Sequence, residues 1–479
     1  MDVCVVGTGY VGLVTGTCLA YLGRNVVCVD IDERKIKMLR EGKSPIYEPG
    51  LDQLIHTGTQ RGNLRFSTDL PGSVKEAEII FIAVGTPPQP SGKADLSFVK
   101  AVAQEIGRTL DCKRRCVVVN KSTVPIGSGN WVEMLVKEGL NENPAYREKL
   151  ASGQNSGAAS TNRRTNGLKP EDVFLVASNP EFLREGSAIT DTFYPDRIVI
   201  GATHPYAAER LRALYEPIVE QTFIAPATAP RPSGFTAVPV VTTDLASAEM
   251  IKYAANAFLA TKISFANEIA NICERVGADI TEVVRGFGLD SRIGPKFLNA
   301  GVGWGGSCFG KDVSAIIDIA MEYGYEPALL RNTVEVNKRQ RLVAVHKLQE
   351  VLKIIKGKTI GLLGLAFKPE TDDLRDAPAL EIARQLLEMG ARVKVYDPIA
   401  NEACRRQHPE LKIEYAADTV NLAEDCDALV IVTEWEEFRY LNLDQIGEVM
   451  HAKVLIDGRN VLDPEAVRAS GFQYRGIGR

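Results

Sequence analysis

The residues that most clearly indicate chemistry surround Cys308, in the run Gly-Trp-Gly-Gly-Ser-Cys-Phe-Gly-Lys-Asp at 303–312. Glycine loses more conformational entropy on folding than other residues, so this many glycines predict a loop folded tightly against something. Such a loop would present the thiol, and Lys311 close by would favour the thiolate. The run therefore predicts a nucleophile. The alternative is a glycine-rich turn in which Cys308 is a small inert residue.

A second set of residues follows the first apolar stretch, where Gly7, Gly9 and Gly12 have the spacing G-x-G-x-x-G and open a helical pattern. In a dinucleotide site, Gly7 makes the tight turn, Gly9 lets the backbone approach a pyrophosphate, and Gly12 lets the helix pack closely on the strand. Asp30 ends the next strand pattern, where a carboxylate bonds the adenine ribose and repels the 2′-phosphate of NADP. The arrangement predicts an NAD site rather than a bare structural turn.

Further candidates for NAD contacts lie in and after this motif. Two later strand ends, at 85–87 (GTP) and 121–125 (KSTVP), are positions where ligands bind in open α/β sheets. Lys35, in the helical pattern after Asp30, is either a ribose or phosphate contact or a solvated helix residue. The remaining candidates for cofactor binding are Tyr10, Val11, Lys35, Thr86 and Thr123.

A cysteine beside a nicotinamide has a specific chemical use. An aldehyde cannot readily give up a hydride until a nucleophile has added to its carbonyl carbon. A thiol forms a thiohemiacetal, which loses a hydride to become a thioester that water hydrolyses. Cys308 in an NAD enzyme therefore predicts oxidation of an alcohol beyond the aldehyde to the acid.

The elements that must position these residues alternate between short apolar runs and amphipathic stretches. Val- and Ile-rich runs without polar alternation are typical of parallel strands covered on both faces by helices. We expect an α/β fold with two Rossmann-like, doubly wound parallel-sheet domains, joined by a long central helix and a helical domain. The expected strands are 3–6, 25–29, 78–84, 116–120 and 174–177, then 359–364, 392–396, 428–432 and 454–456, and the long helix is 242–276.

The expected domains are an NAD-binding domain at 1–212, a helical dimerisation domain at 213–325 and a domain for the nucleotide sugar at 326–479. Two segments look inserted. Residues 141–170 are polar and aperiodic, which predicts a mobile surface loop, and the Pro-rich residues 228–239 are likewise irregular.

Composition narrows the class of protein. A formal net charge of −5 and scattered charges give no footprint for nucleic acid. The N-terminus reads as a strand rather than a signal peptide, and no apolar run is long enough to span a bilayer, so we expect a cytoplasmic protein with no membrane partner. The nine cysteines are then thiols. Cys112 and Cys116 have no second ligand pair, so we predict no metal site.

The chain resembles the UDP-glucose/GDP-mannose dehydrogenase family over essentially its whole length. The resemblance lies in several long motifs in the right order: GTGYVG at 7–12, STVPIG at 122–127, NPEFLREG at 179–186, YPDRIVIG at 194–201, KYAAN at 252–256, the cysteine run, FKP at 367–369, TDDLRDAP at 371–378 and DGR at 457–459. The resemblance implies NAD-dependent, four-electron oxidation of UDP-glucose to UDP-glucuronate. The alternative is a sibling activity on GDP-mannose or a UDP-N-acetylhexosamine.

The resemblance also implies roles for matching residues. Cys308 is the nucleophile. Lys252 and Asn256, one helical turn apart, bind the reacting sugar and stabilise oxyanions. Asp312 handles a catalytic water. Glu181 and Glu185, again spaced by one turn, correspond to carboxylates near the sugar and the nicotinamide, and Glu185 with Thr123 is a candidate base in thioester hydrolysis.

The contacts implied in the same way fall into three groups. Lys311, Arg375 and Glu185 are NAD contacts. Arg292 reaches into the site of a neighbouring subunit, in a homodimer or larger oligomer. The nucleotide-sugar contacts are Phe182, Leu183, Arg184, Phe297, Leu298, Gly305, Phe367, Lys368 and Arg459.

Several alternatives stay open. Lys252 and Asn256 are otherwise solvated helix residues, Glu181 and Glu185 a helix-supporting pair, and Arg459 and Lys368 surface charges. Two rival functions are a one-step dehydrogenase with a structural Cys308 and a non-catalytic NAD-binding protein. The chain has Phe309-Gly310 where many bacterial relatives have a proline before the lysine, which affects the rigidity of the loop.

Overall fold

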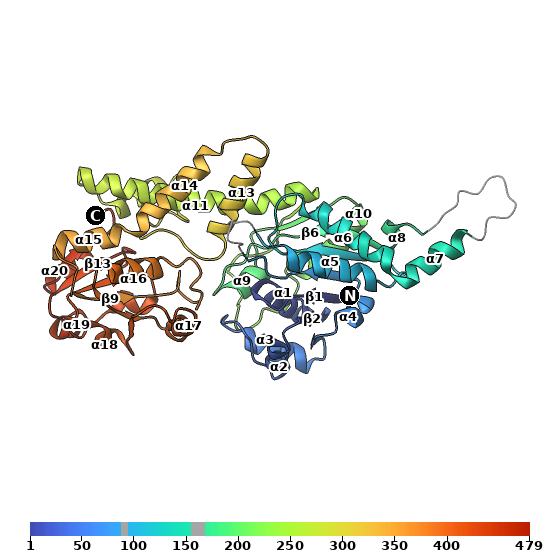
Figure 1. Ribbon diagram of the computed structural model, residues 1–479, viewed down its shortest axis with the longest axis horizontal. Helices are drawn as coiled ribbons and strands as arrows, with labels where there is room; N and C mark the ends of the chain where they lie inside the picture. Colours follow the sequence, from blue (N-terminus) through green and yellow to red (C-terminus); the bar gives the residue numbers. More distant parts are fainter. Residues whose placement is uncertain (88–93, 155–167) are drawn as a thin grey trace. The chain divides into compact units, whose positions relative to one another are not determined.

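The computed structural model describes residues 1–87, 94–154 and 168–479. These residues form two compact units, Met1–Tyr253 and Ala254–Arg479. Each unit contains a predominantly parallel sheet with helices, which confirms the predicted α/β class with two Rossmann-like sheets (Figure 1). The finer division at residues 212 and 325 stays a prediction.

The first unit contains an eight-stranded sheet of order β3-β2-β1-β4-β5-β6-β7-β8. The order of the strands reverses between β1 and β4, and such a switch point is where open α/β sheets bind ligands. The strands are β1 (Asp2–Val6), β2 (Asn25–Val29), β3 (Leu64–Ser67), β4 (Ile79–Ile82), β5 (Cys116–Asn120), β6 (Phe174–Ser178), β7 (Ile198–Ala202) and β8 (Val240–Thr243). The predicted strands correspond to β1, β2, β4, β5 and β6.

One strand pair departs from the predicted parallel arrangement. β7 pairs with β6 in antiparallel register, with Ala177 opposite Ala202. The connection between them contains only the short helix α9 (Ala188–Phe193). The other pairs of this sheet are parallel.

The core of the first unit lies on both faces of this sheet because successive residues of a strand point to opposite sides. Val3 and Val5 join one cluster with residues of α1 and α10, whereas Cys4 and Val6 join another with residues of α5 and α6. This two-sided burial is why the strands read as continuous apolar runs. The helices of this unit are α1 (Tyr10–Tyr21), α2 (Glu33–Arg40), α3 (Leu51–Gln60), α4 (Leu70–Glu76), α5 (Ser97–Thr109), α6 (Ser128–Glu142), α7 (Pro144–Gln154), α8 (Pro170–Val173), α9 and α10 (Pro205–Val219).

The prediction of a single surface loop at 141–170 is wrong for most of its described part. α7 occupies Pro144–Gln154, and Asn143 begins it by accepting hydrogen bonds from the N–H groups of Ala145 and Tyr146. Residues 155–167 lie outside the described residues. The segment 228–239 contains neither helix nor strand.

The long central helix, α11, spans Leu245–Val276 and not 242–276 as predicted. Residues 242 and 243 end β8, and the Asp244 carboxylate accepts a hydrogen bond from the Ser247 N–H at 2.8 Å, as an N-cap does. Polar β-branched residues before a cap are as compatible with a strand as with a helix, so periodicity could not separate them. α11 runs through the boundary between the two units.

The second unit repeats the topology of the first in a six-stranded sheet of order β11-β10-β9-β12-β13-β14. The strand pairings in its sheet are parallel, with β9 and β12 at the switch point. The strands are β9 (Thr359–Leu363), β10 (Arg392–Tyr396), β11 (Glu414–Tyr415), β12 (Ala428–Ile431), β13 (Val454–Asp457) and β14 (Gln473–Arg475), and β9, β10, β12 and β13 were predicted.

Helices of the second unit cover its sheet and extend beyond it. They are α12 (Ile280–Gly288), α13 (Phe309–Glu322), α14 (Ala328–Arg341), α15 (Val343–Leu352), α16 (Pro378–Glu388), α17 (Asn401–Gln407), α18 (Thr419–Ala423), η1 (Glu436–Tyr440), α19 (Leu443–Val449) and α20 (Pro464–Ala469). Among the residues described, none of the helices combines the length and apolarity that a membrane crossing requires.

Candidate active site

The glycine turn after β1 has the backbone geometry that a bound pyrophosphate needs. Gly7 has a φ of +103°, and a Cβ there would lie 2.6 Å from the carbonyl oxygen of Ala83. A Cβ on Gly12 would lie 2.0 Å from the carbonyl oxygen of Gly7, so glycine allows α1 to begin close to the strand. Beside Gly9 the space is open, at the N-terminus of α1, where a phosphate is favoured. These residues fit a dinucleotide.

Asp30 follows β2, and its carboxylate faces the same turn. It accepts hydrogen bonds from the N–H and hydroxyl of Thr8 at 2.9 and 2.7 Å and from the N–H of Asp32 at 3.0 Å. Burial acts to raise the pKa of Asp30, but these bonds and the charge of Lys35, whose Nζ lies 3.9 Å away, lower it overall. The carboxylate is therefore ionised at neutral pH, as exclusion of a 2′-phosphate requires.

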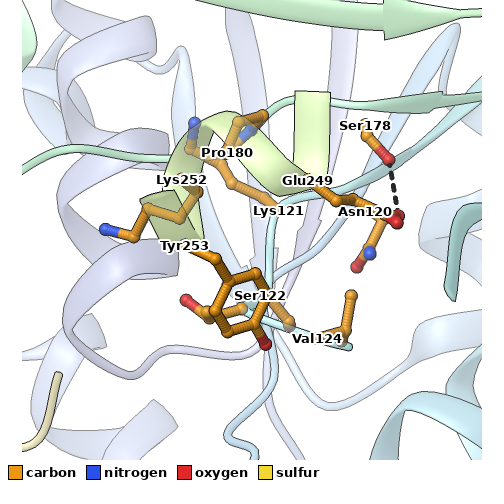
Figure 2. A pocket seen from close by; sticks show the side chains of 10 residues that line it. Asn120, Lys121, Ser122, Val124, Ser178, Pro180, Glu249, Lys252 and Tyr253 are labelled. Atoms are coloured by element: carbon orange, nitrogen blue, oxygen red, sulfur yellow. Dashed lines mark hydrogen bonds between the residues drawn. The ribbon is translucent and has the colours of Figure 1, made fainter. Parts of the chain in front are cut away.

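A small cavity lies at the carboxyl ends of β5 and β6, beside the start of α11 (Figure 2). Glu249 of α11 accepts hydrogen bonds from the N–H groups of Gly127 and Gly129 and from the Ser178 hydroxyl, and so fixes the loop after β5 to the helix. The Thr86 hydroxyl donates to the carbonyl of Thr123 at 3.0 Å and joins the two strand-end loops. The lining residues are Asn120, Lys121, Ser122, Thr123, Val124, Ser178, Pro180, Glu249, Lys252 and Tyr253.

Lys252 and Glu181 form a buried ion pair at this cavity. The Lys252 amine donates to Glu181 Oε1 at 2.9 Å, and each side chain is only 6% exposed. Removing one partner of such a pair strands a charge in a poorly solvated place. The alternative in which Lys252 is a solvated helix residue is therefore wrong.

The segment 179–186 is not helical, so the expectation that Glu181 and Glu185 share a helix face is wrong. Pro180 disfavours helical backbone at the residue before it, and Glu181 Oε2 accepts the Leu183 N–H at 2.8 Å, which stabilises a turn instead. Glu185 lies in the turn before Gly186, whose φ is +80°. The alternative in which the two carboxylates support a helix as an i,i+4 pair is therefore wrong as well.

The neighbouring predicted contacts are occupied by intramolecular partners. The Arg197 guanidinium lies 3.6 Å from the centre of the Phe182 ring, and Lys252 Nζ lies 5.4 Å from it. Arg184 is exposed and pairs with Asp191 at 2.6 Å.

Lys121 and Asn179 are residues of this site that the sequence reasoning missed. The buried Lys121 amine donates to Asn179 Oδ1 at 3.0 Å, and the buried Tyr215 hydroxyl donates to the same oxygen at 2.7 Å. Their position in the two motifs KSTVP and NPEF could have marked them as site residues. A lysine at a strand end, however, does not by its type indicate that it points inward.

In the second unit, Cys308 stands directly before α13 as its N-cap residue. All nine cysteines are among the described residues; none is in a disulfide, and Cys308 alone is exposed. A helix N-terminus stabilises a nearby thiolate through its unpaired N–H groups and its dipole. The run 303–312 is therefore not a loop throughout, because α13 begins at Phe309.

Asp312 lies in the first turn of α13, with 1% of its residue surface exposed. Its carboxylate accepts hydrogen bonds from the Asn256 amide at 2.6 Å and the Lys311 amine at 2.7 Å. Lys311 is thus bound to a carboxylate, which weakens its proposed effect on the thiol. Asn256 and Asp312 are brought together as a buried polar pair.

The backbone before Cys308 is held by two residues of α14 that the sequence reasoning missed. Asn337 accepts from the Trp304 N–H at 2.8 Å and donates to its carbonyl at 3.0 Å. One turn later, Arg341 donates to the Trp304 carbonyl at 2.9 Å and to the Asp376 carboxylate at 2.6 and 2.7 Å. Polar residues in the helical pattern 328–341 read as a solvated face, so no signal marked these two as buried.

Glycine is required where this loop meets the segment 371–378. A Cβ on Gly305 would lie 2.2 Å from the Asp376 carbonyl oxygen, and one on Gly306 would lie 2.7 Å from the Phe367 ring. The Gly306 N–H donates to the Arg375 carbonyl at 3.0 Å. The side chain of Arg375 is itself paired with Asp373.

The other predicted sugar contacts of this unit have varied environments. Arg459 donates to the carbonyls of Val432 and Gly303, so it braces the cysteine loop. Arg292 is exposed and paired with Asp290. Leu298 is buried, Phe297 packs edge-on against Phe309, and Lys368 Nζ lies 5.4 Å from the Phe367 ring.

Comparison with known proteins identifies the family. Models of the UDP-glucose/GDP-mannose dehydrogenase family match the chain over residues 1–219 (NAD binding domain), 246–339 (central domain) and 361–464 (UDP binding domain). The chain belongs to this family. The predicted resemblance and the predicted NAD cofactor are thereby confirmed.

Individual relatives agree over the full length. The chain is 46% identical over 477 residues to the UDP-glucose 6-dehydrogenase TuaD of Bacillus subtilis, covering 100% of this chain and 93% of that protein. A UDP-glucose dehydrogenase from Pyrobaculum islandicum has a TM-score of 0.84 and 38% identity, over 99% of this chain and 97% of that one. A UDP-D-ManNAc dehydrogenase from Pyrococcus horikoshii has a TM-score of 0.81 and 26% identity, over 100% and 99%.

Proposed function

We propose that the protein oxidises UDP-glucose to UDP-glucuronate, with NAD as the oxidant and a thioester on Cys308 as the intermediate. The observation that carries this proposal is the exposed thiol at the N-terminus of α13, with the buried Asp312–Asn256 pair one helical turn behind it. The full-length relatives named UDP-glucose 6-dehydrogenase support the choice of substrate.

In the first oxidation, the C6 hydroxyl of the glucose loses a proton and C6 loses a hydride, giving the aldehyde. NAD, when bound, supplies the hydride acceptor for this oxidation and the next one. We assign the proton to a water held by Asp312, whose carboxylate is already oriented by Asn256 and Lys311. Lys252, a buried cation, stabilises the developing oxyanion.

In the second oxidation, the Cys308 sulfur adds to the aldehyde carbon and forms a thiohemiacetal. This loses a hydride from C6 and the hydroxyl proton and becomes a thioester. Water then attacks the thioester carbon, the carbon–sulfur bond breaks, and the thiol is restored with release of the carboxylate. Glu185 and Thr123 are the proposed groups that activate this water.

The remaining roles are proposed by the same reasoning. Glu181 holds Lys252 in place through the ion pair at 2.9 Å. The uridine and phosphate contacts are assigned to the second unit, with Lys368 and Arg459 near the ends of β9 and β13 as the cations. The NAD contacts are Gly7, Gly9, Tyr10, Val11, Gly12, Asp30, Lys35, Thr86, Lys311 and Arg375.

We also propose a cytoplasmic homodimer. Phe258, Phe265 and Ile272 recur at intervals of seven along α11 and are 65%, 50% and 49% exposed. An apolar stripe with this repeat is typical of a helix that packs against another helix. Arg292 is the residue proposed to reach the partner's site.

The decisive experiment counts NADH per molecule of sugar. Purified protein is incubated with limiting UDP-glucose, GDP-mannose or UDP-N-acetylglucosamine and excess NAD, and NADH and sugar acid are measured. We expect two NADH and one UDP-glucuronate per UDP-glucose, and much slower turnover of the other sugars. One NADH per sugar would indicate the one-step alternative, and preference for another sugar would indicate the sibling activity.

Cys308→Ser tests the nucleophile in the same assay. Because a serine hydroxyl is a far weaker nucleophile than a thiolate, we expect acid production to fall by roughly 10³-fold or more. Ser314→Ala, further along α13, is the matched control and is expected to keep most of the activity. Full acid output from Cys308→Ser would overturn the covalent mechanism.

A further inference from the structure

Glu48 is a buried carboxylate outside the residues assigned to the reaction. It lies between α2 and α3 and is 7% exposed. Its Oε2 accepts the Gly186 N–H at 2.7 Å and the Tyr10 hydroxyl, and its Oε1 accepts the Ala188 N–H at 2.7 Å and the Ile189 N–H at 3.4 Å. One side chain therefore connects the start of α1 to the end of the segment 179–186.

The Tyr10 hydroxyl completes this connection. It donates to Glu48 and accepts the Gly186 N–H at 2.9 Å. Tyr10 is the first residue of α1, directly after Gly9, where the pyrophosphate is proposed to bind. The polar end of this tyrosine is thus bound within the protein, while its backbone forms part of the NAD turn.

The segment joined in this way carries two proposed catalytic carboxylates. Glu185 directly precedes Gly186, and Glu181 lies at the start of the same non-helical stretch. No regular helix or strand includes residues 179–187, so their position depends on individual hydrogen bonds, among them the backbone bond from the Asn179 N–H to the Asn120 carbonyl at 3.0 Å. Gly186 with its φ of +80° and N–H bonded to Tyr10 and Glu48 is one such anchor.

Keeping this carboxylate buried has an energetic cost. Burial raises the pKa of Glu48, although four hydrogen-bond donors act to lower it. The hydrogen bonds therefore offset the desolvation of the carboxylate only in part. A costly group that joins two ligand-binding segments is more simply explained by the placement of those segments than by stability.

We infer that Glu48 is a positioning residue that holds the segment bearing Glu181 and Glu185 against the NAD-binding turn, so that cofactor binding and placement of these carboxylates depend on one another. This inference rests on the proposed function for the roles of the carboxylates. Coupling of this kind is reciprocal: the sugar must alter the affinity for the cofactor by the factor by which the cofactor alters the affinity for the sugar.

The test uses the full-length protein and NADH fluorescence, because NADH with UDP-glucose forms a complex that cannot react forward. The dissociation constant of NADH is measured with and without saturating UDP-glucose, together with kcat, KM and the melting temperature. Glu48→Gln keeps the shape of the side chain but replaces one accepting oxygen by an NH2 group, which cannot accept from N–H donors. Tyr10→Phe removes only the hydroxyl, so it is the variant expected to fold without difficulty.

We expect Glu48→Gln to weaken NADH binding by roughly tenfold, to lower kcat by about ten- to a hundredfold, and to bring the effect of UDP-glucose on NADH affinity close to none. Tyr10→Phe should show a smaller loss of the same coupling. Glu41→Gln, an exposed carboxylate at the end of α2, is the matched control and should match the wild type.

Unchanged NADH affinity and unchanged coupling in Glu48→Gln or Tyr10→Phe would overturn the inference. A lower melting temperature with normal coupling between UDP-glucose and NADH binding would also overturn the inference, since it would show a purely structural role. The proposed function fails separately, through the absence of turnover or of UDP-glucose binding in the wild type. In that case the inference is judged on NADH affinity alone, which Glu48→Gln must still reduce.

Discussion

At the scale of single residues, Lys121 has an unusual electrostatic environment. Its amine is buried at the end of β5 and donates to Asn179. Burial lowers the pKa of Lys121 from its ordinary 10.5 to about 8, while the Glu181 carboxylate acts to raise it and the Lys252 cation to lower it. The protonated form is thus less favourable in the folded protein than in the unfolded chain.

This pKa gives a stability prediction with a definite sign. Between pH 8 and 10.5 the unfolded chain binds more protons than the folded one, so the wild type gains stability from Lys121 as the pH rises. Lys121→Met lacks this dependence. We expect the free energy of unfolding of the wild type to rise relative to the variant by up to roughly 3 kcal/mol over this window, as measured by urea denaturation.

The comparison across pH isolates the titration. The variant also loses the hydrogen bond to Asn179, but that loss is the same at every pH at which the amine stays bonded. Parallel pH profiles for the two proteins would show that Lys121 keeps an ordinary pKa in the folded state.

At the scale of elements, α14 organises the loop that leads to Cys308. Asn337 and Arg341 lie one turn apart on this helix and bond both the N–H and the carbonyl of Trp304. Arg341 also bonds the carboxylates of Asp376, just before α16, and of Glu381, in the first turn of α16. One helix face thus fixes two loops of the proposed site relative to each other.

Replacement of Arg341 should therefore affect both catalysis and stability. Arg341→Lys keeps the charge but cannot reach the Trp304 carbonyl and both carboxylates together, because an ammonium lacks the planar fork of donors. We expect kcat to fall by about tenfold, from misplacement of the thiol, and the free energy of unfolding to fall by roughly 2 kcal/mol.

Steady-state kinetics and urea denaturation measure the two effects. Lys338→Met, at an exposed position of the same helix, is the control and should change neither by much. Since Cys308 alone is exposed among the nine cysteines, its rate of alkylation by iodoacetamide reports directly on the loop. Wild-type kcat and alkylation rate in Arg341→Lys would refute the positioning role.

At the scale of the whole molecule, the proposed dimer depends on the exposed stripe of α11. Phe265→Glu places a charge in the middle of that stripe, where burial against a partner would be costly. We expect the variant to sediment as a monomer at micromolar concentration while the wild type sediments as a dimer. Phe98→Glu, at a similarly exposed phenylalanine of α5, should leave the wild-type assembly unchanged. A dimer in both variants would place the interface elsewhere.

The sequence was sufficient for features whose cause is local or strictly repeated. Gly7 and Gly12 could be assigned because backbone conformation and close approach exclude a Cβ there, and apolar runs such as Cys116–Asn120 predict strands because parallel sheets are buried on both faces. Membership of the family followed from the order of long motifs. The non-helical path of Glu181 and Glu185 was not predicted, because spacing alone cannot distinguish a helix from a turn stabilised by its own side chains.

Contacts between residues that are far apart in the chain could not be predicted, for a different reason. A polar side chain points inward when distant donors and acceptors surround it, as they do for Glu48, Lys121, Asn337 and Arg341. The residue type in the sequence is the same whether such a side chain is solvated or buried. Only packing brings Glu48 to Gly186 and Arg341 to Trp304. The sequence by itself therefore determined the family and the cofactor turn and predicted the nucleophile, whereas the tertiary structure decided which buried polar groups surround these residues, because desolvation and hydrogen bonding are properties of the assembled chain.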